Sequence, residues 1–127
     1  MTDSVTILNA TKAELPRLPF EAIKNKVLGK DYELSLVFVS EDKSRKLNAA
    51  YRRKDKPTNI LSFPLNNNAG EIFICPSVAK KEASKFGRSY SNFLSFLFIH
   101  GLMHLKGFRH GSRMEDAERK VRKTFHV

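Results

Sequence analysis

Three histidines near the end of the chain have the types and spacing of a metal site. They are His100, His104 and His110, and the segment Phe93–Leu105, which holds the first two, is almost entirely apolar. Residues four apart share one face of a helix, so His100 and His104 would project together. Three neutral imidazoles with a fourth position left open form the ligand set of a catalytic zinc site. The spacing therefore predicts one Zn²⁺ per chain.

A buried helix and the turn after it must position these side chains. Gly107 can adopt the left-handed conformation that ends a helix, and the turn would bring His110 back toward the other two histidines. A single histidine in an apolar helix is more often a satisfied core residue than a ligand, but this combination of three rarely arises by chance. A structural zinc site normally has four protein ligands, often cysteines, and no obvious fourth ligand lies nearby.

A metal held by three histidines supplies an activated water that can attack a carbonyl group or a phosphorus centre. The spacing His100-x3-His104-x2-Gly107-x2-His110 is also that of the metzincin proteases. Those enzymes need a glutamate directly after the first histidine as general base, and this chain has Gly101 there. A proteolytic function is therefore disfavoured.

The net charge of +10 favours a polyanionic partner, of which nucleic acid is the commonest. From Lys43 to Lys56 there are seven Lys or Arg residues and one acid, a segment that we call the first basic cluster. A second basic cluster, diluted by acids, contains Lys106, Arg109, Arg113, Arg119, Lys120, Arg122 and Lys123. Phosphodiester cleavage builds negative charge on non-bridging oxygens, and Arg52 is the group we expect to stabilise it. Glu71 is a weak candidate for the general base and more plausible as a structural residue.

The length and the pattern of elements indicate one α+β domain over residues 1–127. Strands are expected at 5–8, 33–40, 58–63 and 70–75, and helices at 20–28, 41–51, 76–86, 90–105 and 112–125. Ser40 would cap the second helix, Pro64 would close the third strand, and Ser112 with Glu115 would form a capping box for the last helix. Strands early and helices late favour a mixed four-stranded sheet with about five helices rather than a doubly wound fold.

The composition also bears on location. The longest apolar run is too short to span a bilayer, and the first residues do not have the pattern of a secretory leader. Cys75 is the only cysteine, which excludes an internal disulfide, and we expect it to be a small core residue. We therefore expect a cytoplasmic protein without a membrane partner.

Three segments resemble the bacterial YbeY family, in the family's order. They are Tyr51-Arg52-x-Lys54-Asp55-Lys56-Pro57-Thr58-Asn59-x-Leu61-Ser62-Phe63-Pro64, then Gly70-Glu71-Ile72, then His100-Gly101-x-x-His104-Leu105-x-Gly107-Phe108-x-His110. The resemblance covers roughly residues 35 to 111. It implies a metal-dependent endoribonuclease directed at single strands, which acts in 16S rRNA 3′-end maturation and ribosome quality control. It also implies an α+β fold with a mixed four-stranded sheet.

In that family three histidines bind a metal, usually taken to be zinc, and the resemblance carries this role onto His100, His104 and His110. The family's functional arginine falls on Arg52. The partners implied are the 16S rRNA precursor in the small ribosomal subunit, a small-subunit ribosomal protein and an Era-type GTPase. A non-catalytic assembly factor, which binds rRNA and holds zinc for its fold, is the alternative that the residues leave open.

Two positions depart from the family pattern. Arg109 stands where family members usually have an acidic residue. If that acid orients a metal ligand or a water in the family, no residue at this position does so here, and Arg109 could contact RNA instead. Asn59 stands where many members have Asp, a change that we expect to be tolerated. Neither position is a predicted metal ligand.

Overall fold

The computed structural model describes residues 4–127, so the first three residues of the expected domain lie outside the described part. The elements in chain order are β1 (Val5–Asn9), α1 (Phe20–Leu28), β2 (Glu33–Phe38), α2 (Glu41–Arg52), β3 (Ile60–Asn66), β4 (Ala69–Ile74), α3 (Pro76–Ala83), the 3₁₀ turn η1 (Ser84–Phe86), α4 (Tyr90–Leu105) and α5 (Ser112–Phe125). They form a single α+β domain, as the sequence predicts.

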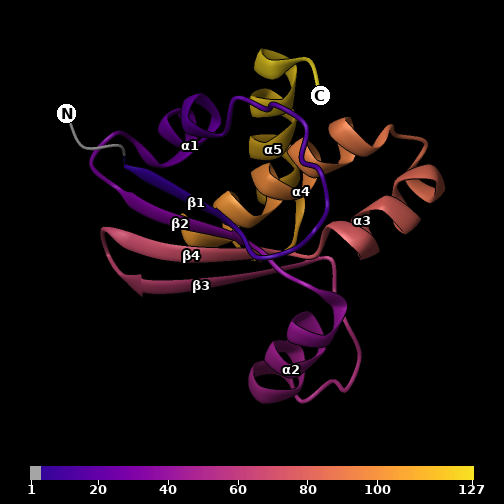
Figure 1. The fold of residues 1–127 in the computed structure, drawn as a ribbon. Coiled ribbons are helices and arrows are strands. Elements are labelled where there is room, and N and C mark those ends of the chain that lie inside the picture. Colours follow the sequence, from indigo (N-terminus) through magenta and orange to yellow (C-terminus); the bar gives the residue numbers. More distant parts are fainter. Residues whose placement is uncertain (1–3) are drawn as a thin grey trace.

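The four strands form one mixed sheet with the order β1-β2-β4-β3. β1 and β4 both pair with β2 in parallel, whereas β3 runs antiparallel to β4. Helices α1, α4 and α5 lie on one side of the sheet and α2 lies on the other, at one end (Figure 1). The sheet therefore has a covered inner face and an outer face that is only partly covered.

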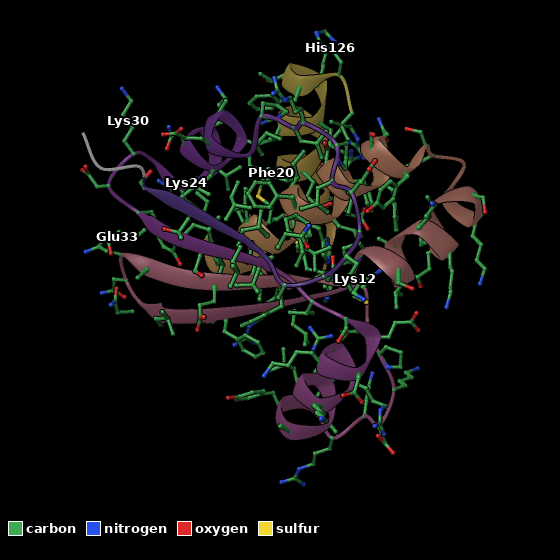
Figure 2. All side chains as sticks on the ribbon, viewed as in Figure 1. Lys12, Phe20, Lys24, Lys30, Glu33 and His126 are labelled. Carbon is green, nitrogen blue, oxygen red and sulfur yellow. The ribbon has the colours of Figure 1, made fainter. Side chains whose placement is uncertain are left out.

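Helix α4 is the centre of the packing. Its residues are buried on nearly every side because the sheet lies against one face and α1 and α5 lie against the others. The aromatic core beside it includes Phe20 of α1, whose ring meets Phe98 of α4 edge-on at 5.0 Å. Figure 2 shows the side chains around Phe20 filling the space between the sheet and these helices. The expectation of a central buried helix that carries two of the histidines is confirmed.

Gly101 lets α4 approach the sheet closely. A Cβ atom at this position would lie 2.8 Å from Cδ1 of Ile60 and 2.9 Å from Oγ of Ser62. The Ser62 hydroxyl donates a hydrogen bond to the Gly101 carbonyl over 3.2 Å. A glutamate here would have to displace the side chains of Ile60 and Ser62, so the position that carries the base in a metzincin is filled by packing against β3 in this chain.

Local sequence signals account for several helix boundaries. Ser40 and Ser89 cap α2 and α4, since their hydroxyls accept hydrogen bonds from the backbone N–H of Lys43 and Asn92. Cys75 is buried and free, in agreement with the prediction of a core residue. Within residues 4–127, none of the helices combines the length and apolar composition needed to cross a bilayer.

Three predicted details are wrong. Strand β3 does not end at Pro64 but continues to Asn66 through a register shift. Proline has no backbone N–H to donate to a neighbouring strand, and an edge strand such as β3 tolerates this loss because one of its sides has no neighbour. The predicted helix over 76–86 tightens into the 3₁₀ turn η1 at its end. The capping box at Ser112 does not form, because α5 begins at Ser112 itself and Gly111 occupies the cap position without a side-chain hydrogen bond.

Candidate metal centre and active site

His100, His104 and His110 converge at the end of α4. One side-chain nitrogen from each lies within 4.8 Å of the other two. The ring centroids are 4.7 Å apart for His100 and His104, 5.2 Å for His100 and His110, and 4.6 Å for His104 and His110. The first two side chains are half-buried and His110 is exposed. The three residues singled out by their spacing thus form one group that could bind a metal.

The turn at Gly107 brings the third histidine into place. Gly107 has φ +104°, and its N–H donates to the carbonyl of His104 over 3.0 Å. The next N–H, that of Phe108, donates to the carbonyl of Met103 over 3.0 Å, which completes a Schellman motif. The chain therefore reverses directly after α4, as the sequence predicts, and returns His110 toward the helix.

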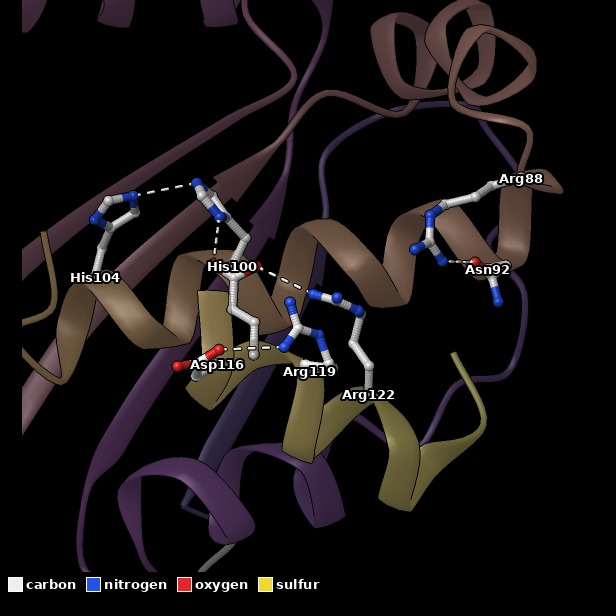
Figure 3. Close-up of polar contacts among 8 residues, drawn as sticks. Arg88, Asn92, His100, His104, Asp116, Arg119 and Arg122 are labelled. Carbon is white, nitrogen blue, oxygen red and sulfur yellow. Dashed lines mark hydrogen bonds and ion pairs between the residues drawn. The ribbon is translucent and has the colours of Figure 1, made fainter. Parts of the chain in front are cut away.

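Hydrogen bonds at Nδ1 fix which nitrogen each helical histidine presents. His100 Nδ1 lies 2.9 Å from Oε1 of Glu118, and His104 Nδ1 lies 3.2 Å from the carbonyl oxygen of Phe108. A carboxylate and a carbonyl can only accept, so both Nδ1 atoms carry a hydrogen, and in the neutral imidazole this leaves the lone pair on Nε2. Figure 3 shows the two rings beside α4, with a dashed line between their nearest nitrogens.

The spacing of these nitrogens fits a tetrahedral metal. Nε2 of His100 and Nε2 of His104 are 3.2 Å apart. Zinc–nitrogen bonds of 2.0–2.1 Å in tetrahedral geometry place two ligand nitrogens about 3.3–3.4 Å apart. Burial lowers the pKa of His104, and nearby His100 and His110 lower it further, so its imidazole is neutral at pH 7 as a ligand must be. The donor set and its geometry both fit the group expected from the sequence.

Glu118 is a residue of this site that the sequence reasoning missed. Its side chain is buried on α5, where it accepts from His100 and pairs with Nη1 of Arg122 over 3.3 Å. Carboxylates that hold the second nitrogen of a histidine ligand fix its orientation and raise its basicity. A signal was present, because Glu118 falls four residues after Met114 and three before Val121, on the apolar face of the helix.

A cavity of about 270 Å³ adjoins the histidines. Its lining consists of Arg52, Asn59, Ile60, Ser62, Phe86, Phe93, Phe96, Leu97, His100, Gly101, His104 and His110. Arg52 is the last residue of α2, so the helix end and the histidine cluster face the same hollow although they are far apart in sequence. The structure thereby brings together all four residues that the sequence singled out.

Two members of the first basic cluster are ion-paired in the described part of the chain, and the members at its C-terminal end are not. On α2, Arg45 pairs with both Asp42 and Asp55 at 3.2 Å and 3.1 Å, and Lys46 pairs with Asp42. At the other end of the cluster, Arg52, Arg53, Lys54 and Lys56 are exposed and have no ion-pair partner among residues 4–127. Of these four free cations, Arg52 lines the cavity, so this end of the cluster brings uncompensated positive charge to it.

Glu71 lies away from the histidines. It lines a separate hollow on the outer face of the sheet together with Tyr51 of α2 and Phe63 of β3. Because residues alternate between the faces of a strand, its neighbour Ile72 points inward to α4 and Glu71 points outward. Its candidacy as general base therefore has no geometric support, and within residues 4–127 no carboxylate lines the cavity that holds Arg52.

The two departures from the family pattern have different surroundings. Nδ2 of Asn59 donates a hydrogen bond to Oε1 of Glu82 over 2.9 Å. An Asp at position 59 would instead place its carboxylate next to that of Glu82. This contact explains why an amide fits at position 59 in this chain. The side chain of Arg109 is exposed and makes no hydrogen bond or ion pair with the rest of residues 4–127.

An α+β domain whose buried helix and following turn gather three histidines beside an arginine-lined cavity defines a class: a metal-site protein with a cleft suited to an anionic substrate. Residues 4–125 match the family model described as Endoribonuclease YbeY. The chain therefore belongs to the YbeY family, whose curated members carry the name endoribonuclease.

Individual relatives agree with this assignment. The Endoribonuclease YbeY of Aliarcobacter butzleri is 36% identical over 124 residues, which cover 93% of this chain and 86% of the relative. That of Colwellia psychrerythraea is 41% identical over 95 residues, covering 69% of this chain and 61% of the relative. The solution structure of TM1509 from Thermotoga maritima has a TM-score of 0.68 at 26% identity, covering 96% of this chain and 89% of that chain.

Proposed function

We propose that the protein is a metal-dependent endoribonuclease that cleaves single-stranded RNA. The observation that carries this proposal is the shared cavity, which is lined by an unpaired arginine and by three histidines, two of which place their Nε2 atoms 3.2 Å apart. Membership of a family of endoribonucleases supports the same reaction. The net charge of +10 supports an RNA substrate.

We infer that the metal is zinc, one ion per chain, held by His100, His104 and His110. Three imidazoles are typical of catalytic zinc and leave a coordination position for a water or substrate. Such an ion supplies a Lewis acid and a water of lowered pKa. Glu118 and the Phe108 carbonyl keep the two helical imidazoles in the tautomer that can bind it.

Arg52 is the residue that we assign to charge stabilisation. Its guanidinium is free of ion pairs within residues 4–127, so it can contact a phosphate without first breaking a contact. The planar fork can hold two non-bridging oxygens at once and is matched to the charge that develops on them. Arg53, Lys54 and Lys56 next to it would attract the RNA backbone through long-range charge.

We further propose that this activity serves 16S rRNA 3′-end maturation and ribosome quality control in the cytoplasm, on the precursor within the small ribosomal subunit. The family membership and the basic surface support this role. A small-subunit ribosomal protein and an Era-type GTPase are the protein partners that the family resemblance suggests.

The test compares four proteins purified in parallel: wild type, His104→Ala, Arg52→Ala and Lys56→Ala. Labelled single-stranded RNA is incubated with each, and cleavage and bound zinc are measured on the same samples. Arg52→Ala should keep its zinc and lose about 100- to 1,000-fold in rate, as when one donor to a developing anion is removed. Lys56→Ala is the comparison variant, an exposed cation of the loop after α2 that does not line the cavity, and it should lose only a small part of the long-range attraction to RNA.

Each result has a distinct meaning. Loss of both zinc and cleavage in His104→Ala, together with a slow zinc-loaded Arg52→Ala, supports both assignments. Equal cleavage by all four preparations indicates a contaminating ribonuclease and contradicts the proposal. Zinc binding without cleavage by wild type leaves the protein as a zinc-containing, rRNA-binding assembly factor.

A further inference from the structure

One exposed aromatic ring stands at the cavity beside the histidines. Phe86 in η1 is 56% exposed, and within residues 4–127 it is the only one of the strongly exposed large apolar residues that lines this cavity. Its ring stacks on the fully buried ring of Phe93, with centroids 5.0 Å apart and an interplanar angle of 24°. One face of Phe86 is therefore supported from below and the other is open.

The supporting rings form a wall. Phe93 and Phe96 of α4 are nearly parallel, with an interplanar angle of 13° and centroids 5.9 Å apart, and Phe86 lies 6.4 Å from Phe96. All three rings line the cavity that also holds Arg52 and the histidines. We call Phe86, Phe93 and Phe96 the aromatic wall.

Two arginines pack against this wall, of which Arg122 is paired with Glu118. The guanidinium carbon of Arg88 lies 4.4 Å from the ring centroid of Phe96, and that of Arg122 lies 5.3 Å from it. Arg88 hydrogen-bonds to the side-chain oxygen of Asn92 and pairs with no carboxylate among residues 4–127. Figure 3 shows Arg88 with Asn92 at the far end of α4 from His104, and Arg122 on α5 beside the helix.

The aromatic wall and the metal ligands lie in sequence along one face of α4. Phe93, Phe96, His100 and His104 follow at intervals of three or four residues, which places them on one stripe of a helix. From Phe93, the ring on which Phe86 stacks, to His100 the rise along the axis is about 10.5 Å. A nucleotide chain that places a phosphate at the histidines and runs along this stripe would thus bring a base one or two nucleotides away to the wall.

We propose that the open face of Phe86 stacks an unpaired nucleobase of the RNA whose phosphate lies at His100, His104 and His110, while Arg88 holds the adjoining backbone. This assignment rests on the proposed function and specifies how the substrate is bound. Aromatic faces combined with cations are how proteins bind single-stranded nucleic acid, and such stacking tolerates any base because every base has a π face. Bases in a duplex have both faces covered, so the wall selects unpaired RNA.

The test measures binding of a short single-stranded RNA that contains one 2-aminopurine, whose fluorescence is quenched by stacking. The zinc-free wild-type chain is compared with Phe86→Ala, Phe86→Leu, Phe86→Tyr and the control Leu65→Ala, an exposed apolar residue outside the cavity. Phe86→Ala and Phe86→Leu should bind about 5- to 150-fold more weakly and lose the quenching. Phe86→Tyr and Leu65→Ala should behave as wild type.

A change in the RNA checks that the loss comes from stacking and not from misfolding. An RNA that carries an abasic residue at the same position should bind wild type as weakly as the intact RNA binds Phe86→Leu, and the variant should show no further loss. Quenching and affinity that do not depend on Phe86, or no binding of single-stranded RNA at all, would overturn the proposal. The binding assay needs no metal, so its outcome is independent of the cleavage assay. If the zinc-loaded protein does not cleave RNA but quenching still depends on Phe86, the proposed nuclease activity is refuted and the proposed base-stacking site is supported.

Discussion

The helical histidines and the histidine of the loop are held very differently. His100 and His104 project from a buried helix, are half-buried themselves, and have their Nδ1 atoms bonded to Glu118 and to the Phe108 carbonyl. His110 follows a glycine turn, is exposed, and makes no hydrogen bond with other residues of the described range 4–127. The candidate metal site thus consists of a preorganised pair and a third ligand with freedom to move.

This difference indicates how the ligand set is assembled. Two nitrogens already 3.2 Å apart lose little conformational entropy when a metal binds, whereas the loop must be fixed by the third bond. We therefore expect the helical pair to determine whether a metal binds, and His110 to determine how tightly it is held. The following predictions address this contrast in order of decreasing effect.

The largest effect is expected from removal of a helical histidine. His104→Ala should abolish measurable zinc binding, since one lone nitrogen of the preorganised pair would remain. His110→Ala should retain zinc with weaker affinity, because the helical pair is intact. Zinc binding is measured by competition with a chromophoric chelator, with His126→Ala, an exposed histidine at the end of α5, as the control. Equal losses of zinc affinity in His104→Ala and His110→Ala would contradict the claim that the helical pair determines whether a metal binds.

A smaller effect is expected from Glu118, which supports only one of the two helical histidines. Glu118→Ala should lower zinc affinity about 10- to 100-fold, the usual cost of removing a partner that orients a metal ligand. Glu118→Gln keeps an acceptor for the Nδ1–H of His100 and should lose less. Asp116→Asn is the matched control on the same helix, since Asp116 pairs with exposed Arg119 and contacts no histidine. Unchanged zinc affinity in Glu118→Ala would contradict the orienting role.

The smallest effect is expected from the turn that carries His110. Gly107→Ala places a Cβ on a residue at φ +104°, which should cost about 1–2 kcal/mol of unfolding free energy and weaken zinc binding modestly. Gly29→Ala is a close control, because Gly29 has φ +88° and a Cβ added at either glycine would meet no atom within 4 Å. Both variants should lower the Tm, and only Gly107→Ala should affect zinc. An equal effect of Gly107→Ala and Gly29→Ala on zinc affinity would contradict the claim that the turn at Gly107 positions His110 for metal binding.

The sequence was sufficient for features that depend on local spacing. The i, i+4 histidines, the glycine turn and the cap at Ser40 each involve residues close in the chain, and each was predicted. Features that depend on which distant segments meet were predicted only where the family resemblance supplied them, as for Arg52. Glu118 meets His100 across eighteen residues, on a helix whose docking on α4 the sequence does not reveal.

The errors have similar causes. The alternation around Glu71 indicates that it and Ile72 point to opposite faces, but only the packed sheet shows which face carries the histidines. The end of β3 was placed at Pro64 because Pro interrupts central strands, and edge strands tolerate it. Ser112 and Glu115 match a capping box, but the backbone at Gly111 begins the helix one residue earlier than the motif requires.

The most direct test of the central claim is a zinc titration of cleavage. The protein is stripped with a chelator, zinc is returned in known equivalents, and the rate of single-stranded RNA cleavage is measured at each step. The account predicts no cleavage by the stripped protein and a linear rise that ends at one zinc per chain. Full cleavage by the stripped protein, or a rise that persists in His104→Ala, would contradict the assignment of the three histidines to a metal that the reaction needs.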